Sequence, residues 1–236
     1  MKDFRQDFEY FWKRIFVEKQ ITYFARYADG EAGLMVGKTF NQFNQIDGWN
    51  SNGYNQFNID LYNAFKHKDL NYFYAISCKC CDSANKHYLL SETNTPIENI
   101  TYANLWINGN YFLFKDRLSE IKEDVILVGN QQGVDQTFPF KVNSYFPISK
   151  QVVEDWNINK DCIIDNFLDK VNNKENPLVL FMAGPLAEVL ISLSYQNKIK
   201  GRFVDVGSAL DEFIFGRKTR PYMMENTPYS NKICQF

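Results

Sequence analysis

Two carboxylates separated by one glycine, Asp29-Gly30-Glu31, are the feature of this sequence best suited to chemistry. They follow an apolar run, residues 21–24, and precede a small, apolar stretch. Side chains two apart on a strand point to the same face, and glycine lets the backbone turn without a Cβ clash. We therefore expect Asp29 and Glu31 to converge on one divalent metal, manganese or magnesium, held jointly with a phosphate-bearing substrate. The alternative is a solvated turn in which Asp29 caps the next helix.

The elements that must position this pair alternate along the chain. Apolar runs predict strands at residues 21–24, 71–77, 124–128, 177–182 and 202–206. Helical spacing of apolar residues predicts helices over residues 4–15, 52–68 (after Ser51 as N-cap), 103–121 and 186–197, and residues 158–177 are polar enough for a surface helix. Strands alternating with helices predict an α/β fold with a mostly parallel sheet, in a single domain covering residues 1–236.

Ligands of such sheets bind beyond the carboxyl ends of the strands. Polar or glycine-containing segments follow four predicted strands, and they are Asp29-Gly30-Glu31, residues 129–133, Ala183-Gly184-Pro185 and residues 205–211. We expect these segments to face one crevice, with Arg26, Asp205, Gly207 and Ser208 among the residues that bind the ligand. Gly184-Pro185 before a helix predicts free amides that would hold a diphosphate, although ordinary punctuation between strand and helix explains the pair equally well.

Two further segments suit a sugar-phosphate ligand. Residues 216–222 concentrate three cations, and Arg220 in a mobile segment would close over an anionic leaving group. A solvated turn is the alternative there. Asn108, Asn110 and Tyr111 combine amides with an aromatic ring, which suits the lining of a sugar site but would equally satisfy a buried loop. The glycine motifs of dinucleotide oxidoreductases and P-loop enzymes are absent.

Composition narrows the class of protein further. The formal net charge is −2, so nucleic acid is not expected as a partner, and a charged beginning without a long apolar segment predicts a soluble, cytoplasmic protein with no transmembrane segment. The five cysteines form no disulfide framework. Cys78, Cys80 and Cys81 lack the paired spacing of structural zinc sites and a second cysteine pair, so free thiols are expected in preference to zinc.

The order of the short motifs resembles the GT-D-type glycosyltransferases. The motifs that carry the resemblance are Arg26-Tyr27-Ala28-Asp29-Gly30-Glu31, Gln45-Ile46-Asp47-Gly48-Trp49, residues 103–111, Gly184-Pro185-Leu186-Ala187 and residues 205–211. The resemblance implies a Rossmann-like single domain that binds a divalent metal through Asp29 and Glu31, with a nucleotide-sugar, typically a UDP-sugar, as donor. Ser208 stands where members of this family often carry a histidine, so Asp211 or water would complete the metal site.

These observations predict a metal-dependent glycosyltransferase that moves a sugar to the hydroxyl of a glycan, lipid-linked or protein-linked acceptor. The metal, the helix end at Gly184 and Arg220 would stabilise the leaving diphosphate. Asp211 would take the proton of the acceptor, a role that a retaining enzyme does not need. A metal-dependent phosphohydrolase of nucleotide-sugars and a sugar-nucleotide-binding module without activity are the alternatives.

Overall fold

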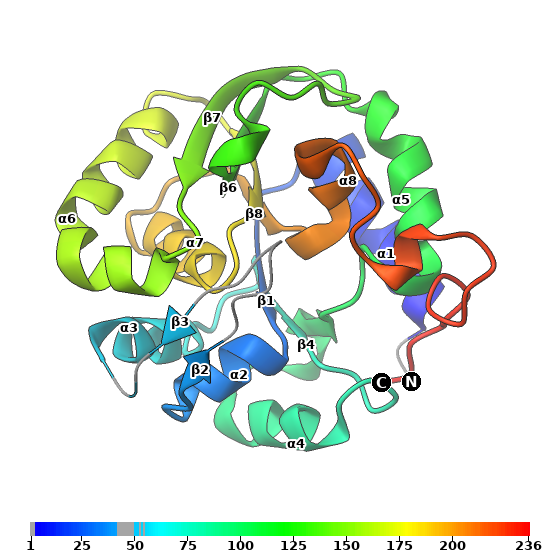
Figure 1. Cartoon of the computed structure of the whole chain (residues 1–236), viewed down its shortest axis with the longest axis horizontal. Helices are drawn as coiled ribbons and strands as arrows, with labels where there is room; N and C mark the ends of the chain where they lie inside the picture. The colour runs from blue at the N-terminus through cyan, green and yellow to red at the C-terminus, as the bar shows by residue number, and fades with distance from the viewer. Residues whose placement is uncertain (1–2, 42–49, 52, 54) are drawn as a thin grey trace.

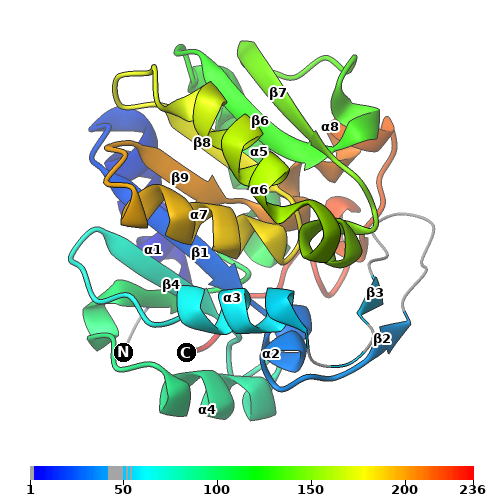
Figure 2. The same ribbon diagram turned by 90° about the vertical axis from the view of Figure 1, so that its left-hand side faces the viewer.

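The structure is a computed structural model that describes residues 3–41, 50–51, 53 and 55–236. In the described part of the chain, seven strands form one parallel sheet in the order β5-β4-β1-β9-β8-β6-β7 (Figures 1 and 2). The strands are β1 (Thr22–Tyr27), β4 (Tyr72–Ile76), β5 (Ile100–Tyr102), β6 (Val125–Asn130), β7 (Val142–Ile148), β8 (Leu178–Met182) and β9 (Arg202–Asp205). Two short strands, β2 (Phe40–Asn41) and β3 (Asn50–Ser51), pair separately in antiparallel fashion. The predicted α/β fold with a parallel sheet is confirmed.

Helices cover both faces of the sheet. Helices α3 (Gln56–Ala64), α6 (Val152–Val171) and α7 (Leu186–Gln196) lie on one face, whereas α1 (Phe4–Trp12) and α5 (Tyr111–Arg117) lie on the other (Figures 1 and 2). Each face packs its own apolar cluster, one including Phe57, Trp156 and Leu190 and the other including Phe8 and Phe114. Because the central strands are buried on both sides, their sequences are continuously apolar. The remaining α-helices are α2 (Asp29–Met35), α4 (Ser83–Glu92) and α8 (Asp211–Phe215).

Several predicted elements differ from the structure in extent. Strand β1 runs three residues beyond the predicted end, to Tyr27. Helix α3 begins after Asn55, whose side chain accepts a hydrogen bond from the backbone N–H of Phe57, and Ser51 belongs to β3. The helix predicted over residues 103–121 is interrupted, because Asn108 has a positive φ of 53° and only Tyr111–Arg117 is α-helical. The motif formed by residues 45–49 lies outside the described residues.

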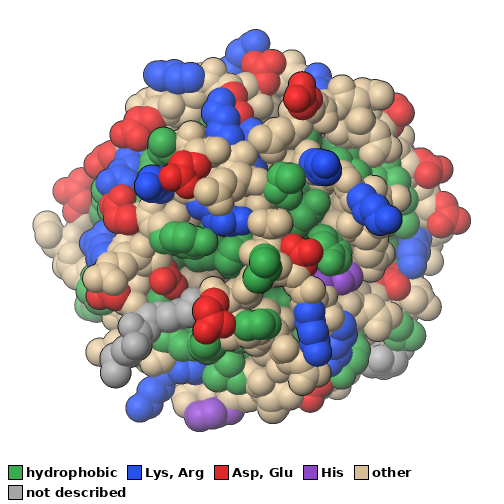
Figure 3. Space-filling view, turned by 180° about the vertical axis from the view of Figure 1, so that it is seen from behind, with side chains coloured by type: hydrophobic (Ala, Val, Ile, Leu, Met, Phe, Trp, Pro, Cys, Tyr) green, Lys and Arg blue, Asp and Glu red, His purple; other side chains and the backbone are tan. Residues whose placement is uncertain are grey.

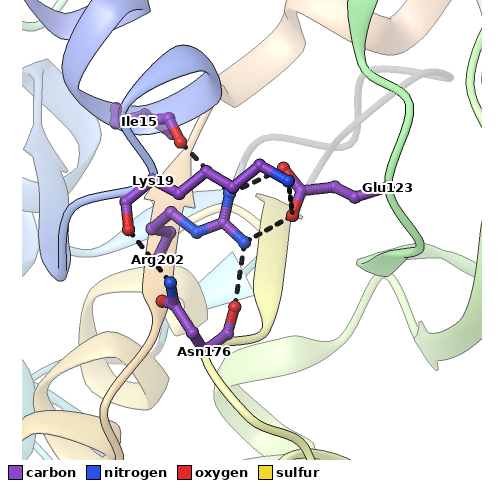
Figure 4. Close-up of polar contacts among 5 residues, drawn as sticks. All are labelled: Ile15, Lys19, Glu123, Asn176 and Arg202. Carbon is purple, nitrogen blue, oxygen red and sulfur yellow. Dashed lines mark hydrogen bonds and ion pairs between the residues drawn. The ribbon is translucent and has the colours of Figure 1, made fainter.

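A buried ion pair fixes the amino ends of three neighbouring elements, opposite the ends at which ligands of parallel sheets bind (Figure 4). Arg202 begins β9, and its guanidinium group donates two hydrogen bonds of 2.6 Å to the carboxylate of Glu123, just before β6. It also donates to the carbonyl oxygens of Asn176 (2.8 Å) and Ile15 (3.2 Å). Burial would raise the pKa of Glu123, but the bonds and charge of Arg202 outweigh it and lower that pKa.

One face of the molecule carries acidic and basic side chains side by side (Figure 3). Figure 3 shows both signs interspersed over one face, in keeping with the net charge of −2. Over the described residues, the helices are too short or too polar to cross a membrane.

Candidate active site

A cavity of about 410 Å³ lies at the carboxyl ends of the parallel strands. Its walls come from the segments that follow β1, β5, β6, β7, β8 and β9, so strands far apart in the sequence contribute to one site. The volume falls within the range of typical small-molecule sites. The predicted site residues that line it are Arg26, Asp29, Glu31, Gly184, Gly207, Ser208, Asp211 and Arg220.

The two carboxylates after β1 line the cavity in a geometry that differs from the expected one. Asp29 and Glu31 belong to the first turn of α2, and residues two apart on a helix point about 200° apart. The strand geometry from which their convergence was expected is therefore wrong, whereas their binding of a metal stays a prediction. Glu31 is buried and accepts a hydrogen bond from the backbone N–H of Ala28 (2.9 Å), whereas Asp29 is exposed. Burial raises the pKa of Glu31, and Arg26 partly offsets that rise.

The donor atoms at this wall fit a metal that shares its ligands with a phosphate better than they fit a closed protein cage. Among the described residues, no three Asp, Glu, His or Cys side chains in the cavity place ligand atoms close enough for one ion. Magnesium needs only one or two carboxylates when substrate phosphates and water complete its shell. The exposed carboxylate of Asp29 meets that requirement, with Glu31 on the same wall.

A cluster of buried charged side chains lies at the wall of the cavity. The Nε atom of Arg26 lies 3.1 Å from the carboxylate of Asp205, and the backbone N–H of Arg26 donates to Glu188 (3.2 Å). Burial opposes the charge of Arg26, but the attraction of Asp205, Glu31 and Glu188 outweighs it and raises the pKa of the guanidinium group. Arg26 therefore remains a cation at the cavity wall, and Asp205, which does not line the cavity, is a positioning residue.

Glu188 is a feature that the sequence analysis missed. It is fully buried in the first turn of α7, and its Oε2 atom has no hydrogen-bond partner among the described residues. Burial raises its pKa well above the ordinary value, and the nearby carboxylates of Asp205 and Glu31 raise it further. The signal in the sequence is a glutamate among the apolar residues of the predicted helix. The spacing of the neighbouring leucines, however, predicts only a packed helix.

Two glycines with positive φ shape the cavity wall. Gly184 (φ 52°) and Gly207 (φ 55°) adopt the left-handed conformation that favours glycine. A Cβ atom on Gly207 would lie 2.8 Å from Nε of Arg26, so the close approach of the guanidinium group requires glycine. The carboxylate of Asp205 accepts the backbone N–H of Gly207 (2.7 Å), which fixes the turn that presents Ser208. Pro185, by contrast, is the N-cap of α7 and does not line the cavity.

Asp211 and Arg220 meet at the wall of the cavity. Asp211 is only 6% exposed, and it accepts a hydrogen bond from the hydroxyl of Thr219 (3.1 Å). The Nε atom of Arg220 lies 3.5 Å from the same carboxylate. Burial raises the pKa of Asp211 to about 7, although the hydrogen bond from Thr219 and the charge of Arg26 oppose the rise. A carboxylate with such a pKa suits proton transfer near neutral pH.

Three residues of the predicted sugar-binding stretch form hydrogen bonds within the protein interior. Asn110 is fully buried and donates to the carbonyl oxygens of Leu105 (2.9 Å) and Phe4 (3.3 Å), and the hydroxyl of Tyr111 donates to Glu212 (2.8 Å). Asn108 donates to the thiol sulfur of Cys234 (3.5 Å). None of these three residues lines the cavity, and their hydrogen bonds within the interior favour the alternative of a buried loop.

Other lining residues come from positions that the sequence analysis did not select. Asn104, from the stretch just described, lines the cavity, as do Asn130 at the end of β6 and Lys150 after β7. Tyr222 also lines it, with its hydroxyl 2.7 Å from Oγ of Ser208. Strand β7 was not predicted because it is a half-exposed edge strand without a continuous apolar run, so Lys150 had no strand end to mark it.

Comparison with known proteins places the fold. The chain matches no family model and no curated protein. A solved structure described as "The highly conserved domain of unknown function 1792 has a distinct glycosyltransferase fold" is 15% identical, with a TM-score of 0.60 over 99% of this chain and 90% of that chain. "A New Glycosyltransferase (DUF1792) from Streptococcus sanguinis" is 14% identical, with a TM-score of 0.61 over 98% and 91%.

The chain therefore has a glycosyltransferase fold. In particular, it is the fold described for domain of unknown function 1792, and this agrees with the resemblance in motif order to the GT-D-type enzymes. At 14–15% identity the likeness concerns the fold alone.

Proposed function

We propose that this protein is a metal-dependent glycosyltransferase that moves a sugar from a nucleotide-diphosphate donor, a UDP-sugar, to the hydroxyl of a glycan or glycoconjugate acceptor. One observation carries the proposal: the cavity at the strand ends combines an exposed carboxylate, a buried carboxylate with a pKa of about 7 and an arginine. In a metal-dependent glycosyl transfer, a carboxylate can hold the metal and a cation can stabilise the leaving phosphate, and a second carboxylate can accept the proton of the attacking hydroxyl where the reaction needs a base. The similar structures described as glycosyltransferases support the same class of reaction.

The leaving group is the part of the reaction on which the cavity acts most directly. Cleavage of the bond between sugar and diphosphate develops negative charge on the phosphate. Arg220 and the backbone around Gly184 line the cavity and would bind that charge. Asp29, assisted by Glu31, would hold a divalent cation, which supplies further charge stabilisation when bound.

Asp211 is the residue that would accept the proton of the attacking hydroxyl. Its carboxylate is held by Thr219 and Arg220 at the cavity wall. With a pKa of about 7, a substantial fraction is ionised at neutral pH while the group retains the basicity needed to accept a proton. Arg220 pairs with Asp211 in this structure, and a bound diphosphate would compete for that arginine.

The experiment is a panel of nucleotide-sugars incubated with and without manganese, with release of free nucleoside diphosphate as the readout. We expect manganese-dependent release from one donor. In Asp29→Asn the rate falls on the order of a hundredfold or more, because a catalytic metal contributes several kcal/mol. The control is Asp161→Asn, which removes another exposed aspartate, on α6, and keeps the full rate.

Three results would overturn this proposal. Full turnover in Asp29→Asn refutes the metal role of that residue. Release that stays equally fast when candidate acceptors are added, with no glycosylated product, indicates a phosphohydrolase. Binding of UDP without release from any donor or acceptor mixture indicates a binding module.

A further inference from the structure

Four cysteine thiols from two distant parts of the chain meet beside the carboxyl end of β4. Cys78 follows that strand, Cys80 and Cys81 lie in the turn before α4, and Cys234 is two residues from the end of the sequence. Figures 1 and 2 both show the carboxyl-terminal segment arriving next to α4. The four sulfur atoms all lie within 4.8 Å of one another.

The spacing of the sulfur atoms is that of one tetrahedral ion. The sulfur atoms of Cys78 and Cys80 are 3.4 Å apart. The sulfur atom of Cys81 lies 3.9 Å from that of Cys80 and 3.9 Å from that of Cys234. Zinc–sulfur bonds of about 2.3 Å give a tetrahedron with edges of about 3.8 Å. A disulfide would need about 2.05 Å. We infer that Cys78, Cys80, Cys81 and Cys234 bind one Zn²⁺ as a closed structural site.

The surroundings of the sulfur atoms are those of metal-bound thiolates. The side-chain amide of Asn104 donates to Sγ of Cys81 (3.2 Å), and that of Asn108 donates to Sγ of Cys234 (3.5 Å). The backbone N–H of Gln235 donates to Sγ of Cys80 (3.4 Å). N–H groups aimed at sulfur stabilise the charge of thiolate ligands and fix their orientation. This network gives Asn108 a role in orienting Cys234, in place of the predicted role in sugar binding.

The site ties the end of the chain to the wall of the cavity. The backbone N–H of Gly109 donates to the carbonyl oxygen of Lys232 (3.0 Å), and that of Lys79 donates to Gln235 (3.1 Å). Asn104, which donates to Cys81, also lines the cavity. A metal at the cysteine cluster would therefore hold the carboxyl-terminal segment and the Asn104 wall in place. Four thiolates leave no open position for a substrate, so the role is structural.

The first test measures metal content and thiol reactivity of the full-length protein produced with zinc in the medium. We expect one equivalent of zinc. With an alkylating reagent, only the exposed Cys162 reacts rapidly before a chelator is added, and all five cysteines react afterwards. Because Cys80 and Cys81 are exposed, burial does not account for their protection, whereas a bound metal does.

The second test uses matched variants. Cys234→Ser loses the zinc, and Cys162→Ser, a cysteine on α6 outside the cluster, keeps it. Cobalt substituted into the wild-type protein gives thiolate-to-metal charge-transfer absorption and the intense visible bands of a tetrahedral site, a readout that does not depend on a variant folding. The inference is overturned by rapid alkylation of Cys80 and Cys81 in protein supplied with zinc, by disulfides among these cysteines, or by iron in place of zinc. None of these outcomes decides whether the cavity catalyses sugar transfer, which the release of nucleoside diphosphate tests separately.

Discussion

The buried ion pair between Arg202 and Glu123 should contribute strongly to the stability of the fold, and replacing Glu123 tests this. In Glu123→Gln the guanidinium group keeps its bonds to two backbone carbonyl oxygens but loses its only close carboxylate among the described residues. The side chain of Arg202 is 2% exposed, so water cannot replace the lost partner. Removing one partner of a buried pair leaves an uncompensated charge in the interior, which costs far more free energy than replacing both partners by apolar residues.

The expected cost follows from the burial of the two side chains. Breaking a fully buried pair costs roughly 3–5 kcal/mol, and the 19% exposure of Glu123 places this pair near the lower end, at about 3 kcal/mol. For a chain of this size, that loss lowers Tm by about 6–12 °C. Glu9 and Arg117 form the matched control, because their bidentate bonds are 2.8 and 2.9 Å long but their side chains are 53% and 25% exposed. Glu9→Gln should cost less than about 1 kcal/mol.

The assay is urea unfolding of both variants and of the wild type, followed by circular dichroism between pH 3 and pH 8. Since the folded-state pKa of Glu123 is lowered, the stabilisation by this pair is present above the ordinary glutamate pKa and is lost as pH falls through the folded value. The difference between wild type and Glu123→Gln should therefore shrink in acid. Equal losses in Glu123→Gln and Glu9→Gln at neutral pH would refute the argument from burial.

Three further predictions concern the cavity. In Asp211→Asn, acceptor-dependent turnover should fall about 10²–10⁴-fold. The wild-type rate should rise with pH through about 7 as this carboxylate ionises. A rate that does not depend on pH would show that Asp211 is not the base. Because its folded-state pKa is raised, the stability contributed by Asp211 is present in acid and lost as pH rises through about 7, so Asp211→Asn should gain stability over the wild type above that pH in urea unfolding. Gly207→Ala should destabilise more than Gly216→Ala in thermal unfolding, because both residues have positive φ but only at Gly207 does the new Cβ meet Arg26; equal losses would contradict the contact.

The sequence predicted the centre of the fold well and its margins poorly. Strands β6, β8 and β9 were found because burial on both faces imposes continuous apolar runs. Strand β7 at the edge is half exposed, and β5 has only three residues, so neither carries such a run. Where the periodicity was strong, boundaries agreed closely, as for the α7 helix, Leu186–Gln196.

The candidate site shows the same division between local pattern and tertiary placement. Polar residues after apolar runs located the cavity, because parallel strands bring their carboxyl ends together. The orientation of Glu31 could not be predicted, since it depends on β1 running on to Tyr27 and α2 starting at once. The cysteine cluster was equally hidden. Its fourth thiol, Cys234, is 153 residues from Cys81, and no short spacing rule connects them.

The central claim is that the cavity at the strand ends binds the nucleotide diphosphate of a sugar donor. A crystal structure determined with UDP and manganese tests it most directly. We expect the metal on the carboxylate of Asp29, with the diphosphate between it, the backbone around Gly184 and the guanidinium group of Arg220. A nucleotide bound elsewhere on the protein, with the cavity filled only by water at saturating UDP, would show that this cavity is not the donor site.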